Sequence, residues 1–308
     1  MIPEYKKYFI GINLGFAVNR FPEPEEWTRA IEQIGVKRVQ FVADLLNPSL
    51  PRSFRYRQIE RTQSLCRDYG ISVESAFTGA FTRVNHFGSR NPEVRNFWID
   101  WFAEYARQMS VLGVTSIGGH PGILSINDDD DKHIRKERIR EIAGCWANVF
   151  ESVGRFGIET ILWEPMSISR EIGHTLEDAQ EFQELMKVYC GDSVKLCLDL
   201  DHGDIESSFS DDTNPISWID KFNNDIGALH LKQTTPDRRK NLSFTPENNQ
   251  IGTVDGTKIL AALVSNFVNP LTMYLELSFR ERNPDDRNAI YGNRMSVQYW
   301  QSLGASVV

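Results

Sequence analysis

The sequence predicts a single (β/α)8 barrel domain that spans residues 1–308. Short apolar runs typical of β-strands alternate eight times with amphipathic stretches of helical period. Glycines stand where several helical stretches give way to the next strand, and this repeated order favours a parallel sheet. With 308 residues, 41% of them hydrophobic, the chain can bury the core of such a barrel.

The predicted strands are rich in branched, leucine and aromatic residues, which favour extended structure. They span residues 8–14, 36–42, 71–77, 114–119, 158–164, 194–200, 226–232 and 271–277. Eight is the number of parallel strands that closes this type of barrel.

The stretches between the strands repeat their apolar side chains with the period of a helix. We predict helices over residues 24–33, 55–69, 92–112, 133–156, 176–188, 214–222, 256–267 and 285–303. Gly35, Gly70, Gly113 and Gly157 follow helices at positions that favour a left-handed cap. Residues 43–54 and 233–253 show neither period, and loops of this length are usually functional or mobile.

Four of the predicted strands end with a side chain that can bind a metal. These side chains are Glu164, Asp199, His230 and Glu276. In each strand, alternation places this group on the face opposite the bulky apolar residues, which suit packing against helices. The four groups should therefore point into the barrel and meet at its C-terminal mouth, where barrel enzymes hold their active sites.

Three buried carboxylates beside one imidazole require a cation, because an uncompensated buried charge is very costly. Three oxygen donors and one nitrogen donor suit Mn²⁺ best, then Mg²⁺ or Co²⁺, and Zn²⁺ is also open. We therefore expect an enzyme that uses one divalent metal ion.

Composition restricts the other classes. The net charge of −8 disfavours nucleic acid as a partner. No run approaches the roughly 18 apolar residues of a membrane span, and the N-terminus lacks the apolar stretch of a signal peptide, so we expect a cytoplasmic protein with no membrane partner. The four cysteines lack CxxC spacing, and we expect them to be small buried residues.

Several segments carry a resemblance to a known family. They are GINLGFAV, RVQFVADLLNP, GGHPG, LWEP, CLDLDHGD, HLKQTT, IGTVD and LEL. Over nearly its whole length the chain resembles the sugar isomerase and epimerase superfamily with a xylose isomerase-like barrel. Within this superfamily it is similar to the branch that contains erythrulose-phosphate isomerases and apiose isomerase.

The resemblance implies a mononuclear metal site and a small-molecule substrate, a sugar or sugar phosphate. By position, the metal ligands would be Glu164, Asp199, His230 and Glu276. His202 takes the place of a histidine that contacts substrate oxygens. A homodimer or homotetramer is also implied.

The expected activity is the isomerisation or epimerisation of a sugar of four or five carbons through a metal-stabilised enediolate. Moving a carbonyl along a sugar, or inverting the carbon beside it, requires removal of a proton from carbon, and a bound metal stabilises the resulting charge. We expect Glu164 and Glu276 to be the acid and base, each binding the metal through one oxygen.

Three further residues are candidates for substrate contacts. His120 either lines the substrate pocket or bonds a loop carbonyl. Lys232 shares the orientation of His230, and it either meets a substrate phosphate or oxyanion or is structural. Arg282 is a phosphate-binding candidate in a mouth loop, with a solvated loop as the alternative, and the same holds for Arg238, Arg239 and Arg280.

Other polar residues have simpler expectations. Asn13, Gln40 and Glu74 share an inward orientation, and we expect them to form a polar network inside the barrel rather than to catalyse. The acidic run at residues 128–131 is expected to face water and to complement a helix dipole.

Four alternatives remain at this point. A lyase or dehydratase would act through the same enediolate, and a subunit of an enzyme that cleaves modified sugars is a further rival. A non-catalytic sugar-binding module is disfavoured because all four ligands are present. A zinc endonuclease acting on abasic DNA shares the barrel. Its resemblance implies a site of three zinc ions that needs a further histidine in an Asp-Arg-His element. This chain has Asp237, Arg238 and Arg239 there, so that histidine is missing.

Overall fold

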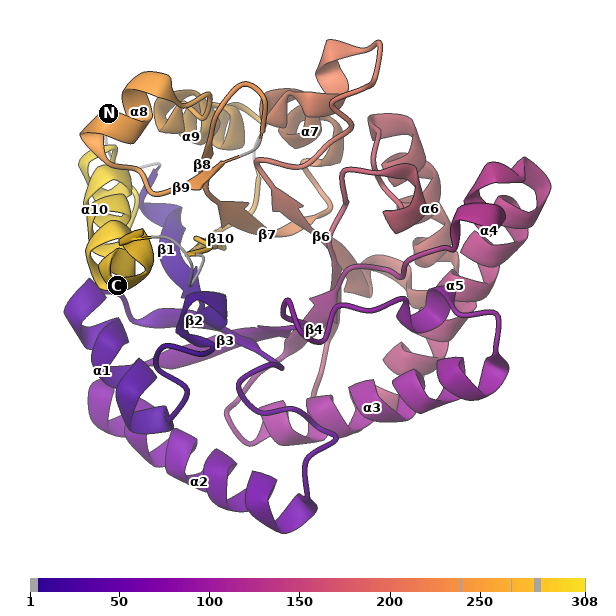
Figure 1. The fold of residues 1–308 in the computed structure, drawn as a ribbon, viewed down its shortest axis with the longest axis horizontal. Helices are drawn as coiled ribbons and strands as arrows, with labels where there is room; N and C mark the ends of the chain where they lie inside the picture. The colour runs from indigo at the N-terminus through magenta and orange to yellow at the C-terminus, as the bar shows by residue number, and fades with distance from the viewer. Residues whose placement is uncertain (1–4, 239, 267, 280–283, 308) are drawn as a thin grey trace.

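The computed structural model describes residues 5–238, 240–266, 268–279 and 284–307. Its centre is a closed barrel of parallel strands in chain order, in which β10 pairs with both β7 and β1 (Figure 1). The barrel strands are β1 (Tyr8–Asn13), β2 (Arg38–Val42), β3 (Ser72–Phe77), β4 (Ser116–Gly119), β5 (Thr160–Trp163), β6 (Val194–Asp199), β7 (Ile226–Leu231) and β10 (Leu271–Leu275). The predicted (β/α)8 barrel is confirmed.

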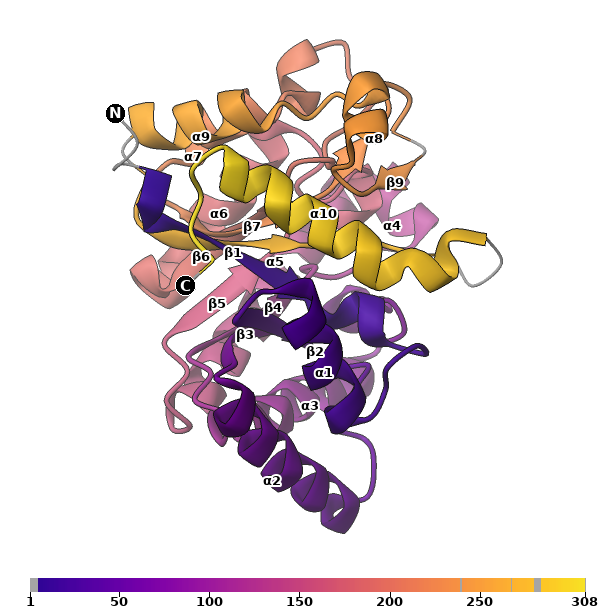
Figure 2. The same ribbon diagram turned by 90° about the vertical axis from the view of Figure 1, so that its left-hand side faces the viewer.

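Helices surround the barrel and form the outer layer (Figures 1 and 2). The long helices are α1 (Pro24–Ile34), α2 (Arg52–Tyr69), α3 (Pro92–Ser110), α5 (Lys132–Gly154), α6 (Leu176–Cys190), α7 (Pro215–Phe222), α9 (Gly256–Ser265) and α10 (Ala289–Ser302). Short 3-10 helices span Tyr5–Lys7, Leu14–Ala17, His86–Gly88, Ser169–Glu171, Gly191–Ser193, Ser210–Thr213 and Pro284–Asn288. Among the described residues, no helix is both long and apolar enough to cross a membrane.

The predicted glycine caps are present. Gly35 has a φ of 90° and Gly70 a φ of 63°, a backbone conformation that residues with a Cβ rarely adopt. Each glycine accordingly ends its helix and turns the chain toward the next strand.

Residues 233–253, which show no period in the sequence, contain the paired strands β8 (Gln233–Thr234) and β9 (Asn241–Leu242) and the helix α8 (Pro246–Ile251). The prediction for the acidic run holds in part: Asp130 and Asp131 are exposed, and the Asp131 side chain accepts from the first N–H groups of α5. It was wrong for Asp128, which is buried in the short helix α4 (Ile126–Asp130). The Asp128 carboxylate pairs with Arg90, a partner 38 residues away that offsets the cost of burial.

The core lies in two places. Large side chains, among them Trp27, Trp146 and Trp300, fill the space between barrel and helices. Inside the barrel, a separate buried cluster consists of Phe77, Leu162, Cys197, Ala228 and Tyr274. All four cysteines are free and buried, as predicted.

Two of the predicted metal-binding residues lie one position beyond a strand. β5 ends at Trp163 and β10 at Leu275, so Glu164 and Glu276 begin the loops that follow. Their backbone N–H groups nevertheless donate to neighbouring strands, at 3.1 Å to Gly119 O and 3.0 Å to Leu231 O. The barrel therefore fixes the backbone of both glutamates.

Candidate active site

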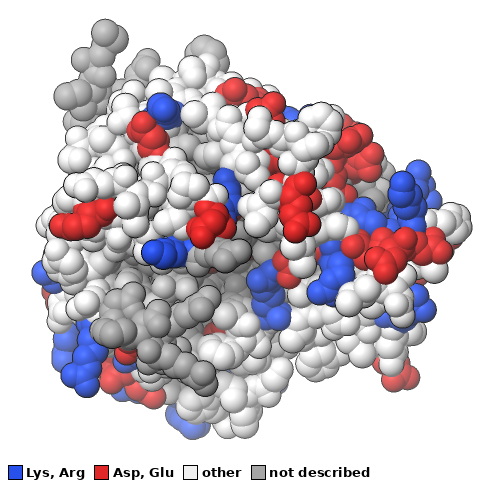
Figure 3. Space-filling model, turned by 45° about the horizontal axis from the view of Figure 1, so that its top comes forward, with Lys and Arg blue, Asp and Glu red and all other residues white. Residues whose placement is uncertain are grey.

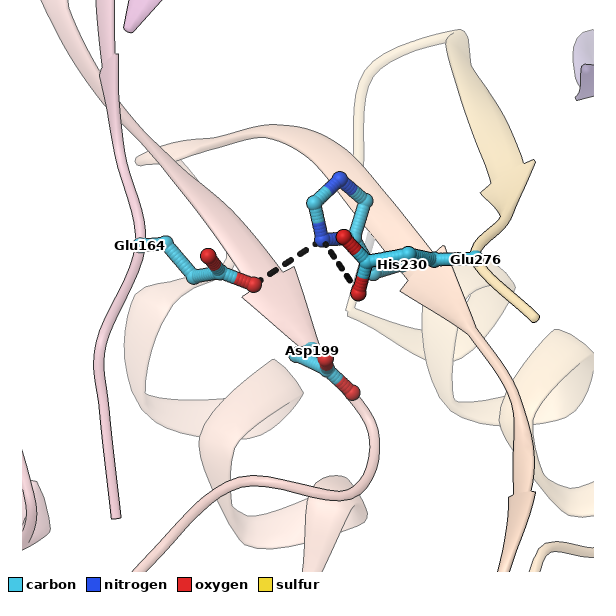
Figure 4. Close-up of side chains that lie close together, drawn as sticks. All are labelled: Glu164, Asp199, His230 and Glu276. Carbon is cyan, nitrogen blue, oxygen red and sulfur yellow. Dashed lines mark hydrogen bonds and ion pairs between the residues drawn. The ribbon is translucent and has the colours of Figure 1, made fainter. Parts of the chain in front are cut away.

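The structure brings the four predicted metal-binding side chains together at the C-terminal ends of β5, β6, β7 and β10 (Figure 4). Each offers one ligand atom, and these atoms of Glu164, Asp199, His230 and Glu276 lie within 4.8 Å of one another. The Asp199 and His230 side chains are fully buried, whereas the Glu276 side chain is 31% exposed. The cluster therefore has a closed floor and one open side.

His230 stands between the two glutamates. Its Nδ1 atom lies 2.9 Å from Glu164 Oε1 and 3.4 Å from Glu276 Oε2. Figure 4 shows the two glutamates reaching this nitrogen from opposite sides of the site. The other ring nitrogen, Nε2, lies 2.7 Å from Gln40 Oε1. Because an amide oxygen only accepts, Nε2 carries the proton of the neutral ring and Nδ1 is the nitrogen available to a metal.

The predicted polar network lies behind this contact. Gln40 Oε1 also accepts a bond from Asn13 Nδ2 at 2.6 Å, and Gln40 Nε2 donates to Ser75 Oγ at 3.2 Å. Ser75 in turn donates to the Tyr274 hydroxyl at 3.3 Å, and that hydroxyl donates to Glu74 at 3.4 Å. These bonds hold the Gln40 amide in one orientation, as partners of a metal-ligating histidine commonly do.

The contacts of Lys232 fit the structural alternative of its two predictions, while a contact with substrate stays a prediction. Its Nζ atom lies 2.5 Å from Asp199 Oδ2 and 3.3 Å from Glu276 Oε2. The side chain is 9% exposed. The ammonium is thus an ion-pair partner of two of the candidate metal-binding carboxylates.

The charged groups of the cluster shift one another's pKa values. Burial would raise the pKa of Asp199, but His202 and Lys232 hold that pKa well below its usual range. Burial would likewise lower the pKa of His230, yet its neighbours, Cys197 first and then the two glutamates, hold that pKa well above its ordinary value. The raised pKa of His230 reflects the negative charge of the surrounding groups, which would also attract a divalent cation.

The residues present fit a divalent metal ion. Asp199 Oδ2 is buried, and its contacts among the described residues are Lys232 Nζ at 2.5 Å and His202 Nε2 at 3.4 Å, which do not use all the lone pairs of the carboxylate. It thus has a lone pair for a cation. Three carboxylates and one imidazole nitrogen are the donor set that Mn²⁺ and similar ions accept.

A cavity of about 420 Å³ opens above the cluster. Its wall includes five of the predicted site residues, namely His120, Glu164, His202, Lys232 and Glu276. This volume suits a small molecule.

The two predicted substrate histidines both line the cavity. His202 Nδ1 donates to Pro165 O at 2.9 Å, and its Nε2 lies 3.4 Å from Asp199 Oδ2. His120 Nε2 lies 2.8 Å from Val84 O, so this residue bonds a loop carbonyl and also forms part of the wall. Burial, and then the charge of neighbouring His86, lowers the pKa of His120 well below its ordinary value, so its ring is neutral near pH 7.

Of the four mouth-loop arginines predicted to bind phosphate or to lie in solvated loops, Arg238 is the one that the structure describes. Its contacts fit neither alternative. Arg238 donates to the backbone carbonyls of Asp201, His202 and Thr213, so its guanidinium fastens the loop after β6. Arg239, Arg280 and Arg282 lie outside the described residues.

Sequence reasoning missed part of the cavity wall. Phe16, Arg20, Asp44, Phe81 and Arg83 belong to it. They lie in the loops after β1, β2 and β3. The only signal for them was position, since loops that follow barrel strands line the mouth.

The surface charges are mixed on the face drawn in Figure 3. Among the described residues, Lys and Arg side chains lie between Asp and Glu side chains there, without a continuous basic band. A DNA-binding surface usually presents such a band.

Comparisons with known proteins agree with this geometry. The model of the xylose isomerase-like TIM barrel family matches residues 19–297. A D-erythrulose 1-phosphate 3-epimerase from Brucella abortus is 31% identical over 293 residues, which are 94% of this chain and 94% of its own length.

Two solved structures share the fold at low sequence identity. A protein from Rhodospirillum rubrum with a provisional xylose isomerase name has a TM-score of 0.85 and 22% identity, covering 96% of this chain and 99% of its own. A D-psicose 3-epimerase from Clostridium cellulolyticum has a TM-score of 0.70 and 16% identity, with the same coverage of both chains.

Proposed function

This chain belongs to the xylose isomerase-like TIM barrel family, and we propose that it is a divalent-metal-dependent epimerase or isomerase of a small ketose or ketose phosphate. The enzyme class, a sugar epimerase or isomerase, follows from the relatives. The metal, the phosphate and the residue roles are our proposal. The relative from Brucella abortus favours a four-carbon ketose phosphate and inversion at C3.

The observation that carries the proposal is the placement of the two glutamates. Glu164 and Glu276 contact His230 Nδ1 from opposite sides, and both line the cavity. One carboxylate can remove the proton from the carbon beside the substrate carbonyl. The other can return a proton on the opposite face, which inverts that carbon.

The remaining residues bind and orient. Asp199 and His230, with one oxygen from each glutamate, would hold the metal. A divalent ion bound there would supply a Lewis acid for the negative charge that develops on the substrate oxygens. We propose Mn²⁺ as the ion, His202 and His120 as contacts for substrate oxygens, and Arg282 as a phosphate contact. Lys232, also predicted to contact substrate, pairs instead with Asp199 and Glu276. We also propose a cytoplasmic homodimer or homotetramer that binds neither nucleic acid nor membrane.

Deuterium exchange tests the activity directly. The Mn²⁺-loaded protein is incubated in D₂O with tetroses, pentoses and their phosphates, D-erythrulose 1-phosphate included, and products are followed by NMR. We expect deuterium on the carbon beside the ketone, with the epimer or isomer as product. Loss of water would indicate the dehydratase instead, and no exchange with any of these sugars would overturn the proposal.

Glutamine variants test the roles of the glutamates. Glu164→Gln and Glu276→Gln should each lower the exchange rate by about 10²- to 10⁴-fold, with an unchanged circular dichroism spectrum. Glu177→Gln, exposed on α6, is the matched control and should keep full activity. Normal turnover in both active-site variants would refute the assignment.

A further inference from the structure

The ion pairs that Lys232 makes do not match the substrate contact predicted for it. Its ammonium lies 2.5 Å from Asp199 Oδ2 and 3.3 Å from Glu276 Oε2, in the wall of the cavity. With 9% of the side chain exposed, this group is largely removed from water. An ammonium held by two carboxylates has little attraction left for a substrate phosphate.

The charge balance of the loaded site explains why a lysine stands there. Three carboxylates and a neutral imidazole, together with a divalent ion, leave one negative charge. Lys232 supplies the positive charge that makes the loaded cluster neutral. Because a net charge in a buried site is costly, Lys232 lowers the cost of burying the three carboxylates, although its own charge repels the bound cation.

Lys232 also restrains the most exposed member of the cluster. Glu276 Oε2 lies 3.3 Å from Lys232 Nζ and 3.4 Å from His230 Nδ1, so this one oxygen is held from two directions. The Glu276 side chain is 31% exposed against 11% for Glu164, and it therefore has more freedom to turn. Fixing Oε2 in the cluster leaves Oε1 for proton transfer.

We propose that Lys232 is a positioning residue that balances the charge of the metal-loaded site and fixes the carboxylate of Glu276. It does not serve as a phosphate-binding group. The inference rests on the proposed function, since it requires a metal ion bound by the four ligands.

Lys232→Met tests this inference because methionine keeps much of the stem and removes the charge. Mn²⁺ affinity is measured by calorimetry on the metal-free protein, without any substrate. The variant should bind Mn²⁺ at least ~10-fold more tightly than the wild type, because a positive charge beside the ion is gone. Lys232→Gln should show the same direction. Lys136→Met, exposed on α5, removes a charge from the surface and should leave the affinity unchanged.

The kinetic readout separates positioning from substrate binding. Lys232→Met should lower kcat by about 10- to 100-fold, because a misplaced catalytic carboxylate is a poor base. KM should change by less than about 3-fold for phosphorylated and unphosphorylated sugars alike. A raised KM for the phosphorylated sugar alone would assign Lys232 to the phosphate and overturn the inference, as would unchanged or weaker Mn²⁺ binding in both variants. A wild-type protein that takes up no metal would overturn the proposed function itself, and this inference with it.

Discussion

His230 Nε2 lies 2.7 Å from the side-chain oxygen of Gln40, on a strand remote from β7 in the sequence. This bond determines which ring nitrogen faces the carboxylates. An imidazole free to rotate or to change tautomer would present the wrong nitrogen part of the time. The polar network inside the barrel therefore supports the proposed metal site.

Removing the Gln40 amide should weaken metal binding. Gln40→Leu deletes the acceptor for His230 Nε2 and should lower Mn²⁺ affinity by about 10- to 100-fold, the usual effect of losing such a partner. Calorimetric titration of the metal-free protein measures it. Ser75→Ala, which removes only the contact on the far side of the amide, should have a smaller effect. Equal affinity in Gln40→Leu and wild type would show that the ring is oriented by other contacts.

Metal binding should stabilise the folded protein. At a Mn²⁺ concentration 100 times the dissociation constant, the free energy of unfolding should rise by about 2.7 kcal/mol, and a chelator should remove this gain. Thermal unfolding with Mn²⁺ and with a chelator measures the difference. Asp199→Ala lacks one ligand and should show little of it. An equal shift in this variant would place the bound metal elsewhere.

Acid should destabilise the protein through His86. This ring is fully buried, and burial lowers its pKa from 6.5 to about 4. Between these values the unfolded chain takes up a proton that the folded chain excludes. The contribution of His86 is thus fully present above about pH 6.5 and is lost as the pH falls toward 4, at about 1.4 kcal/mol per pH unit.

The pH slope of stability in a His86 variant checks this prediction. His86→Gln keeps a donor for Thr82 O and does not titrate, so its free energy of unfolding should fall less steeply between pH 6.5 and 4 than that of the wild type. Substitution of the exposed His133 by Gln should leave the wild-type slope unchanged. Parallel curves for His86→Gln and wild type would mean that the ring takes up its proton without unfolding.

The cluster of four candidate metal ligands could be predicted because two signals agree. Side-chain alternation gives the inward face of a strand, and the barrel brings the C-terminal strand ends together. Glu164 and Glu276 were found although each lies one residue past its strand, since the backbone bonds of the barrel continue through them.

The partners of the charged residues could not be predicted in this way. Lys232 pairs with Asp199 and Glu276 across strands, and Asp128 pairs with Arg90 from another loop. Neither pairing leaves a periodic pattern. Their existence depends on distances between elements, which the sequence alone does not give.

The partners of Arg238, in the loop after β7, could not be predicted from the sequence either. Its contacts indicate that the guanidinium holds a neighbouring loop in place rather than a phosphate. Its guanidinium donates to the backbone carbonyls of Asp201, His202 and Thr213. Arg238→Met should lower the free energy of unfolding by about 1.5–3 kcal/mol, the range for hydrogen bonds to a charged group. It should raise KM for phosphorylated and unphosphorylated sugars by the same factor, because a loosened loop displaces His202 for both. Lys240→Met, a neighbouring exposed cation, should change neither quantity. A KM increase confined to the phosphorylated sugar would show that Arg238 binds the substrate phosphate.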